Sequence, residues 1–158
     1  MPGEQQFRIP KVIVPVFCYT IEQEKIEGEI FLDVSGSTQY TSQQVLDFFN
    51  SGMSFFPIRT TKSPKPILLR KESLVRVDIV RMMETLEEEP SISLAARRQV
   101  TIHLHTLGPI SATVILDVPE EYSRILDLLN MKRTFFPAIV DSNFSLVNST
   151  HIYKIEEA

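Results

Sequence analysis

The sequence lacks several features that would place it in a common class. Its 158 residues contain a single cysteine, Cys18, so no disulfide can form within the chain, which favours a reducing compartment. The longest apolar stretch, "VIVPVFCYTI" (12–21), is shorter than the roughly 20 residues that cross a bilayer, and Pro15 interrupts it. The sequence therefore predicts a cytoplasmic protein with no membrane partner.

Motifs of catalysis are also missing. The chain has only five glycines, and it contains neither a phosphate-binding P-loop nor a G-x-S-x-G nucleophile motif. Cys18 has apolar neighbours in a predicted strand, where a thiol usually packs without reacting. We find no acid–base pair and predict no cofactor. An enzyme is therefore the third interpretation of this sequence, after two kinds of binding protein.

Charge is unevenly distributed along the chain. The net charge of −4 argues against a protein whose whole surface binds nucleic acid. Residues 56–81 nevertheless contain seven basic and two acidic residues, whereas from residue 82 onward six basic residues face eleven acidic ones. Five of the basic residues lie on a proline-containing loop and the strand after it: Arg59, Lys62, Lys65, Arg70 and Lys71. This segment is a candidate site for nucleic acid or phosphate, although no aromatic residues alternate with its charges.

What the sequence does contain is a repeated phrase. "LDFFNSGMSFFP" (46–57) and "LDLLNMKRTFFP" (126–137) share six positions. Besides the leucine that opens each phrase, the shared residues are Asp47, Asn50, Phe55, Phe56 and Pro57 in the first and Asp127, Asn130, Phe135, Phe136 and Pro137 in the second. The similarity continues on both sides, so the sequence predicts an internal duplication.

Each copy has the pattern of two strands, a short helix and two more strands. β-branched residues dominate the predicted strands, and an apolar stripe with helical spacing marks each helix. Strands are predicted near 11–21, 26–34, 54–60, 67–80, 99–107, 110–118, 134–141 and 144–156. One helix is predicted after Thr41 or Ser42, and another begins near Pro119 and carries the stripe Tyr122, Ile125, Leu126 and Leu129. The predicted fold class is α+β, mainly β: two tandem ββαββ repeats, 11–81 and 99–157, joined by an acidic, partly mobile linker at 82–98.

The paired phenylalanines suggest how the copies meet. Neighbouring residues of a strand point to opposite faces, so Phe55 and Phe56 cannot both enter one core. Burying a phenylalanine contributes roughly 1.5–3 kcal/mol. We therefore predict that one phenylalanine of each pair fills its own barrel-like module and the other packs against the sister module. The result would be a pseudo-dimer with a near two-fold axis.

Two smaller patterns allow alternative interpretations. His103 and His105 have a spacing that some metal sites use, but they also alternate with apolar residues as a polar strand face does, and we favour that interpretation and predict no metal. Asp47 and Asp127 each precede an asparagine by three residues on one helix face. They could form a binding pair with that asparagine, or they could fix the turn from helix to strand, which we favour.

The order of these motifs resembles an uncharacterised bacterial domain family of unknown function. Its members read approximately G-x-I-x-L, then R-L-S-D-x-L-N, then F-L-P-L-T-D, then V-N-K-x-x-I. The second copy matches at Arg124, Asp127, Leu129, Asn130, Phe135, Pro137, Val147, Asn148 and Ile152, and the first at Gly28, Ile30, Leu32, Asp47, Asn50, Phe55 and Pro57. The second copy departs at Leu126, and the first has Leu69-Arg70 in place of the final V-N. The resemblance implies a bacterial protein and no particular activity.

Together these features predict a non-catalytic binding or regulatory module that acts through an unidentified protein partner. The alternative is a small-barrel nucleic-acid or phosphate-ligand binder that uses the basic segment 59–71.

Overall fold

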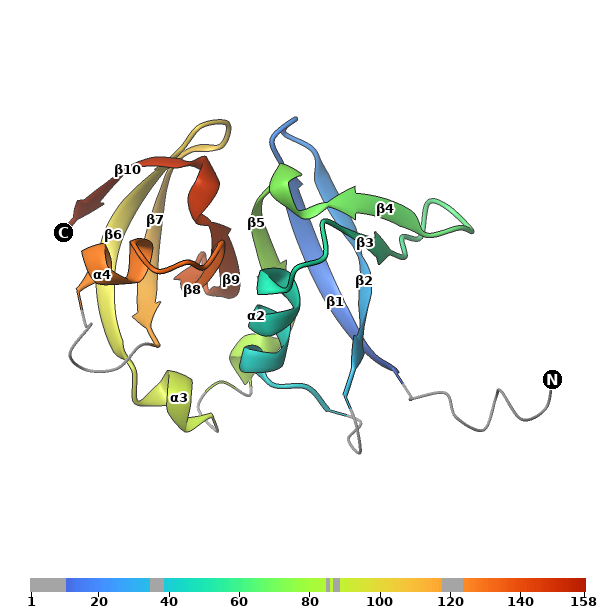
Figure 1. The fold of residues 1–158 in the computed structure, drawn as a ribbon, viewed down its shortest axis with the longest axis horizontal. Helices are drawn as coiled ribbons and strands as arrows, with labels where there is room; N and C mark the ends of the chain where they lie inside the picture. Colours follow the sequence, from blue (N-terminus) through green and yellow to red (C-terminus); the bar gives the residue numbers. More distant parts are fainter. Residues whose placement is uncertain (1–10, 35–38, 85, 87–88, 118–123) are drawn as a thin grey trace.

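The protein is mainly β in the computed structural model, which describes residues 11–34, 39–84, 86, 89–117 and 124–158. This confirms the predicted fold class at the level of secondary structure. Eight strands form one curled sheet in the order β10-β6-β7-β8-β9-β5-β1-β2, and two more form a small sheet, β3-β4 (Figure 1).

The same order of elements occurs in both halves of the described chain. The first half contains β1 (Lys11–Thr20), β2 (Lys25–Asp33), α2 (Ser42–Asn50), β3 (Phe55–Ile58), β4 (Ile67–Arg70), the 3-10 turn η1 (Lys71–Ser73) and β5 (Leu74–Ile79). The second half contains β6 (Ala96–Leu104), β7 (Gly108–Leu116), α4 (Ile125–Leu129), β8 (Phe135–Val140), β9 (Asn143–Asn148), η5 (Ser149–His151) and β10 (Ile152–Glu157). Between them lie η2 (Met82–Glu84) and α3 (Pro90–Ser93).

Strand register is also the same in both halves once the sequence offset is applied. Cys18 pairs with Val77 across β1 and β5, and the matching residues Ile102 and Ile155 pair across β6 and β10. Each of these two ladders has one register shift, and the two shifts match. In the first half Tyr19 and Thr20 pair with Arg76 and Leu74, and in the second half His103 and Leu104 pair with Lys154 and Ile152. The hairpins agree as well: Phe56 pairs with Leu69, and Phe136 with Val147.

Each half has five strands rather than the predicted four. The segments predicted as single strands near 67–80 and 144–156 are each broken by a 3-10 turn. At each break a backbone N–H donates to the residue before the preceding hairpin: Lys71 N to Ser54 O, and Ser149 N to Thr134 O. This hydrogen bond redirects the chain from β4 to β5 and from β9 to β10.

The two halves meet where β5 pairs with β9, with Arg76 opposite Val147 and Ile79 opposite Phe144. These two strands hold different places in their halves, because β5 is the fifth strand of the first and β9 the fourth of the second. A two-fold axis would also require β10 to pair with β4. Among the described residues β10 pairs only with β6, and β4 only with β3. The predicted near two-fold relation is therefore wrong, and the halves are joined head to tail.

The first helix forms where the sequence predicts it. Thr41 is the N-cap of α2, its side chain accepts from Gln44 N, and the Gln44 side chain accepts from Thr41 N. This reciprocal capping box satisfies two backbone donors that a helix start leaves free. The second helix, α4, begins at Ile125 in the structure. Its predicted beginning from Pro119 through Tyr122 lies outside the described residues.

The buried apolar side chains form two clusters, each centred on one half but with members from the other. β5 contributes to both, because Leu74, Val77 and Ile79 enter the first cluster and Val75 the second.

The segment predicted as a linker takes part in the core, because Met82, Leu86 and Ile92 are buried in the first cluster. β6 begins at Ala96, three residues before the predicted boundary. No helix in the described parts of the chain is long and apolar enough to cross a membrane.

Candidate functional site

The five basic residues predicted as a binding site do not act as one patch. Arg59 forms an ion pair with Glu29 at 2.9 Å, and Arg70 lies 4.4 Å from the centre of the Phe55 ring. Lys71 is buried and donates from Nζ to the Phe48 carbonyl and the Ser51 hydroxyl, which caps the end of α2. Burial lowers the pKa of Lys71.

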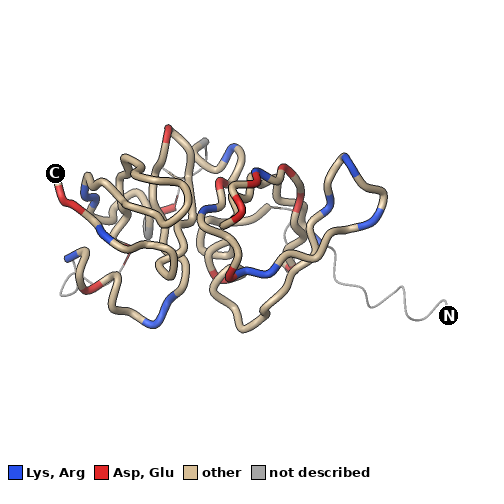
Figure 2. Tube along the Cα trace, turned by 90° about the horizontal axis from the view of Figure 1, so that it is seen from above, with Lys and Arg blue, Asp and Glu red and all other residues tan. Residues whose placement is uncertain are grey.

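Lys62 and Lys65 are exposed, as are Arg59 and Arg70, but the two lysines differ from the arginines in their contacts. Neither forms an ion pair with a described residue. Both lie on the loop between β3 and β4, which projects from one end of the molecule, opposite the end where the chain terminates (Figure 2). Of the five predicted residues, only Lys62 and Lys65 therefore lack a described ion pair, ring contact or side-chain hydrogen bond.

His103 lies on the polar side of β6 and His105 directly follows the end of the strand, in line with the favoured interpretation. The alternating residues Ile102 and Leu104 are buried. His103 Nε2 lies 2.6 Å from a Glu156 carboxylate oxygen, which lowers the pKa of Glu156. In the described residues no group of three or more histidine, cysteine, aspartate or glutamate side chains is placed to hold a metal ion.

The two aspartates hold their own helices rather than the following turns. Asp47 accepts from the Gln43 amide at 2.7 Å, and Asp127 accepts from the Arg124 guanidinium at 3.1 Å. Neither carboxylate accepts a backbone N–H from the adjoining loop among the described hydrogen bonds, so the favoured turn-fixing interpretation is wrong in its detail.

The two asparagines differ. Asn50 binds the second half: its Nδ2 donates to the Phe135 carbonyl at 2.9 Å, and its Oδ1 accepts from the Phe135 N–H at 2.8 Å. Asn130 has the matching position, but its side chain is exposed and forms no hydrogen bond to a described residue. One asparagine therefore clamps a strand and the other has no strand to clamp.

The phenylalanine pairs show the same contrast. Phe136 fills the second cluster, and Phe135 is buried in the first, with its ring centre 5.5 Å from that of Phe49. The prediction that one phenylalanine packs against the sister half is confirmed for this pair. In the other pair Phe56 is buried but Phe55 is 46% exposed, so the prediction is wrong there.

The contact between the halves is a closed interface, in which one surface of the first half encloses apolar side chains of the second. We call the junction seat the surface of α2 and β5 that holds Phe135, Phe144 and Leu146 of β8 and β9. Polar contacts fix its register. The Asp78 carboxylate accepts a bidentate contact from Arg76 at 2.7 Å and a hydrogen bond from the Ser145 hydroxyl at 2.6 Å. The buried Asn148 amide donates to the Leu74 carbonyl.

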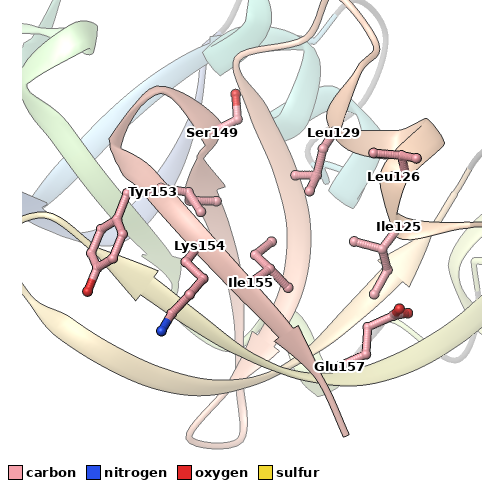
Figure 3. A pocket seen from close by; sticks show the side chains of 9 residues that line it. Ile125, Leu126, Leu129, Ser149, Tyr153, Lys154, Ile155 and Glu157 are labelled. Carbon is pink, nitrogen blue, oxygen red and sulfur yellow. The ribbon is translucent and has the colours of Figure 1, made fainter.

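The second half carries a hollow at the place that matches the junction seat. This open groove, about 450 Å³, lies between α4 and β10 (Figure 3). Ile125, Leu126 and Leu129 line its helix side, and Ile155 lines its strand side. The Tyr153 ring, at the rim, points away from α4 (Figure 3) and lies near the rings of His103 and His105. Leu126 is 59% exposed and Tyr153 61%. The exposure of Leu126 beside this groove marks a contact surface.

A second apolar surface lies on the first half, along the edge formed by β3 and β4. We call it the β3–β4 edge and define it by Phe55, Ile67 and Leu68. These side chains are 46%, 38% and 67% exposed. β4 pairs on one side only, so its other side presents backbone N–H and C=O groups.

Two further features lack catalytic character. A hollow of about 650 Å³ between β2 and α2 is lined by side chains that include Asp33, Asp47, Phe48 and Met53, with no histidine or cysteine among them. Cys18 is fully buried, and burial raises the pKa of its thiol to about 12, which keeps it protonated and inert.

Comparison with known proteins adds no functional evidence. No protein-family model matches the chain, and neither a curated protein nor a solved structure matches it.

Sequence reasoning missed the role of Asn50 and the apolar exposure at Leu68, Leu126 and Tyr153. The repeated phrase contained part of the signal, because it marks both asparagines and all four phenylalanines as matching positions. It could not distinguish the member of each pair that meets a partner strand.

Proposed function

We propose that this protein is a non-catalytic binding or regulatory module that acts through protein contacts. We further propose that it consists of two tandem copies of one small barrel-like unit. The matching order of elements and the matching registers, including the irregularity beside Tyr19/Thr20 and Ile152/Lys154, support the duplication. The head-to-tail junction replaces the predicted two-fold pseudo-dimer.

One observation carries the functional part: β4 and β10, two of the edge strands, lie beside exposed large apolar side chains. A strand edge supplies backbone hydrogen bonds to an added strand, and adjacent apolar side chains supply burial and specificity. Both are present at the β3–β4 edge and at the open groove. A protein strand is the chemistry that fits both.

A polyanion fits these surfaces less well. The nucleic-acid alternative depends on the basic segment, where Arg59 and Arg70 are engaged and Lys71 is buried. Two lysines supply only a weak, salt-sensitive attraction, since each phosphate contact on duplex DNA contributes a slope of about −0.9. The only exposed ring of the FFP pairs, Phe55, is stacked under Arg70.

Site-specific photo-crosslinking in cells tests the proposal. A benzophenone amino acid is placed at Leu68 on one edge, at Tyr153 on the other, and at Leu94, which is 84% exposed but lies on neither edge. We expect protein adducts from positions 68 and 153 and none from 94. Equal labelling at all three positions, or no adduct at 68 and 153, would overturn the proposal.

A titration of fluorescent single- and double-stranded oligonucleotides at low salt tests the alternative. We expect flat anisotropy at tens of micromolar protein. Binding that disappears in a Lys62→Ala, Lys65→Ala variant would replace the protein-contact proposal with a polyanion-binding one.

A further inference from the structure

Each surface that forms the internal junction has a matching surface elsewhere in the chain that the chain itself leaves unused. The partner that these surfaces fit follows only if the proposed function and its duplicated unit hold. The junction brings together the α2/β5 side of the first copy and the β8/β9 side of the second. The matching α4/β10 side forms the open groove, and the matching β3/β4 side forms the β3–β4 edge.

The matching residues agree in chemistry. In the junction seat Leu46, Phe49 and Val77 are buried with the incoming strands, and the corresponding residues Leu126, Leu129 and Ile155 line the open groove. The incoming side supplies Phe135 and Leu146, whose counterparts are the exposed Phe55 and Leu68. The described part of the chain therefore has both an apolar groove that encloses no strand and an apolar strand edge that is not enclosed by a groove.

Polar features are repeated too. Arg76 and Asp78 form an ion pair two residues apart on β5, and Lys154 and Glu156 form one at 3.6 Å in the matching place on β10. Asn50 clamps the backbone of Phe135, whereas the matching Asn130 is exposed. The strand that Asn130 would clamp is β3 at Phe55.

We propose that the partner is a second copy of this chain, and that chains assemble head to tail. The β3–β4 edge of one copy enters the open groove of the next, and β10 pairs with β4. The register follows from the internal junction, where Val77 pairs with Leu146 and Asp78 with Ser145. The same register places Ile155 opposite Leu68, and Glu156 opposite Ile67, of the neighbouring copy.

The charges at the two ends suit this contact. β10 ends in Glu156 and Glu157, whereas the loop that leads into β4 carries Lys62 and Lys65. The two ends lie at opposite extremes of the molecule, so they cannot meet within one chain (Figure 2). In the proposed register Glu157 lies opposite Pro66, next to Lys65. The basic loop thereby gains an acidic partner.

A contact of this kind joins different surfaces, so it does not stop at two copies. Repeating one rotation either closes a ring or builds an open helical chain. Assemblies larger than a dimer are therefore expected, and the concentration at which they form reports the strength of the contact.

Disulfide trapping between purified single-cysteine variants tests the proposal. Ile67→Cys and Glu156→Cys change exposed side chains, and Cys18 can stay because its buried thiol is inert. Directly opposite residues of an antiparallel pair have Cα atoms about 4.5–5.5 Å apart, within the range that a disulfide spans. The matched control mixes Glu156→Cys with Leu94→Cys, and circular dichroism checks the fold of each variant.

We expect the mixed Ile67→Cys/Glu156→Cys disulfide to be the main product and the control mixture to form none above background. We expect the further change Leu68→Asp to abolish the mixed product and the larger assemblies. Equal amounts of the two homodisulfides, or a wild-type protein that is monomeric at all concentrations, would overturn the proposal. If adducts still form in cells at positions 68 and 153, the protein-contact function stands with a different partner; if they are absent as well, both fail.

Discussion

The junction seat of the first half and the open groove of the second are built from elements at matching places in the two halves, but only the seat encloses a strand. In the seat, α2 and β5 enclose Phe135, Phe144 and Leu146, and every residue of β5 is buried. In the groove, α4 and β10 enclose no strand, and no residue of β10 is buried. The difference shows what a partner strand does here: it changes an exposed edge strand into a central one.

The comparison also explains why one half exposes apolar residues that the other half buries. In the proposed arrangement of two copies of one unit, a head-to-tail contact within the chain uses one surface of each kind. One surface of each kind then remains unused. Phe55 and Leu68 on one side, and Leu126 on the other, belong to these remaining surfaces. Their exposure is a consequence of the number of units rather than of poor packing.

The largest expected effect distinguishes the two phenylalanines that open the FFP motifs. Phe135→Ala should lower the free energy of unfolding by about 3–5 kcal/mol, because it leaves a cavity in the junction seat. Phe55→Ala should lower it by about 1 kcal/mol or less at dilute protein, since only its contact with Arg70 is lost. Urea denaturation measures both. Equal losses of stability would contradict the conclusion that the Phe135 ring is packed in the junction seat and the Phe55 ring is not.

A smaller effect separates the asparagines. Asn50→Ala removes both hydrogen bonds to the Phe135 backbone and should cost about 1–3 kcal/mol. Asn130→Ala removes an exposed amide and should leave the stability of the dilute protein unchanged within about 0.5 kcal/mol. Thermal unfolding at low protein concentration makes the comparison. An equal cost at Asn130 would mean that the open groove is already occupied.

The smallest effect concerns Lys71, whose counterpart in the second half is Ser149. Burial lowers the pKa of Lys71 in the folded state below its ordinary value of 10.5. Between these two values the unfolded chain binds more protons, so the contribution of Lys71 to stability rises with pH. Lys71→Met should remove that rise, and Ser149→Ala should not. Urea midpoints measured across the alkaline range below pH 10.5 test this, and an unchanged profile in Lys71→Met would contradict it.

Local features were predictable from the sequence, and contacts between distant residues were not. The Thr41 cap, the stripe of Val45, Leu46 and Phe49, and the first hairpin all follow from short-range patterns, and the structure contains them. The break between β4 and β5 was missed because the deciding hydrogen bond, Lys71 N to Ser54 O, joins residues 17 positions apart.

The candidate site was harder to predict for the same reason. A run of basic letters does not show that Lys71 reaches back to cap α2. The repeated phrase does not show that β5 pairs with β9 rather than with its own counterpart, because strand order between units depends on the fit of whole surfaces. The predicted two-fold axis assumed that like surfaces meet, and the structure joins unlike ones.

Hydrogen exchange measured over a series of protein concentrations tests the central claim most directly. β5 and β9 already pair with each other, so segments 74–79 and 143–148 should be protected to the same degree throughout. Segments 67–70 and 152–157 contain the free edges of β4 and β10, and their protection should rise together as concentration increases. Exchange in β4 and β10 that does not change with concentration, or added protection in other segments only, would contradict the claim that these two strands are the open counterparts of the internal junction.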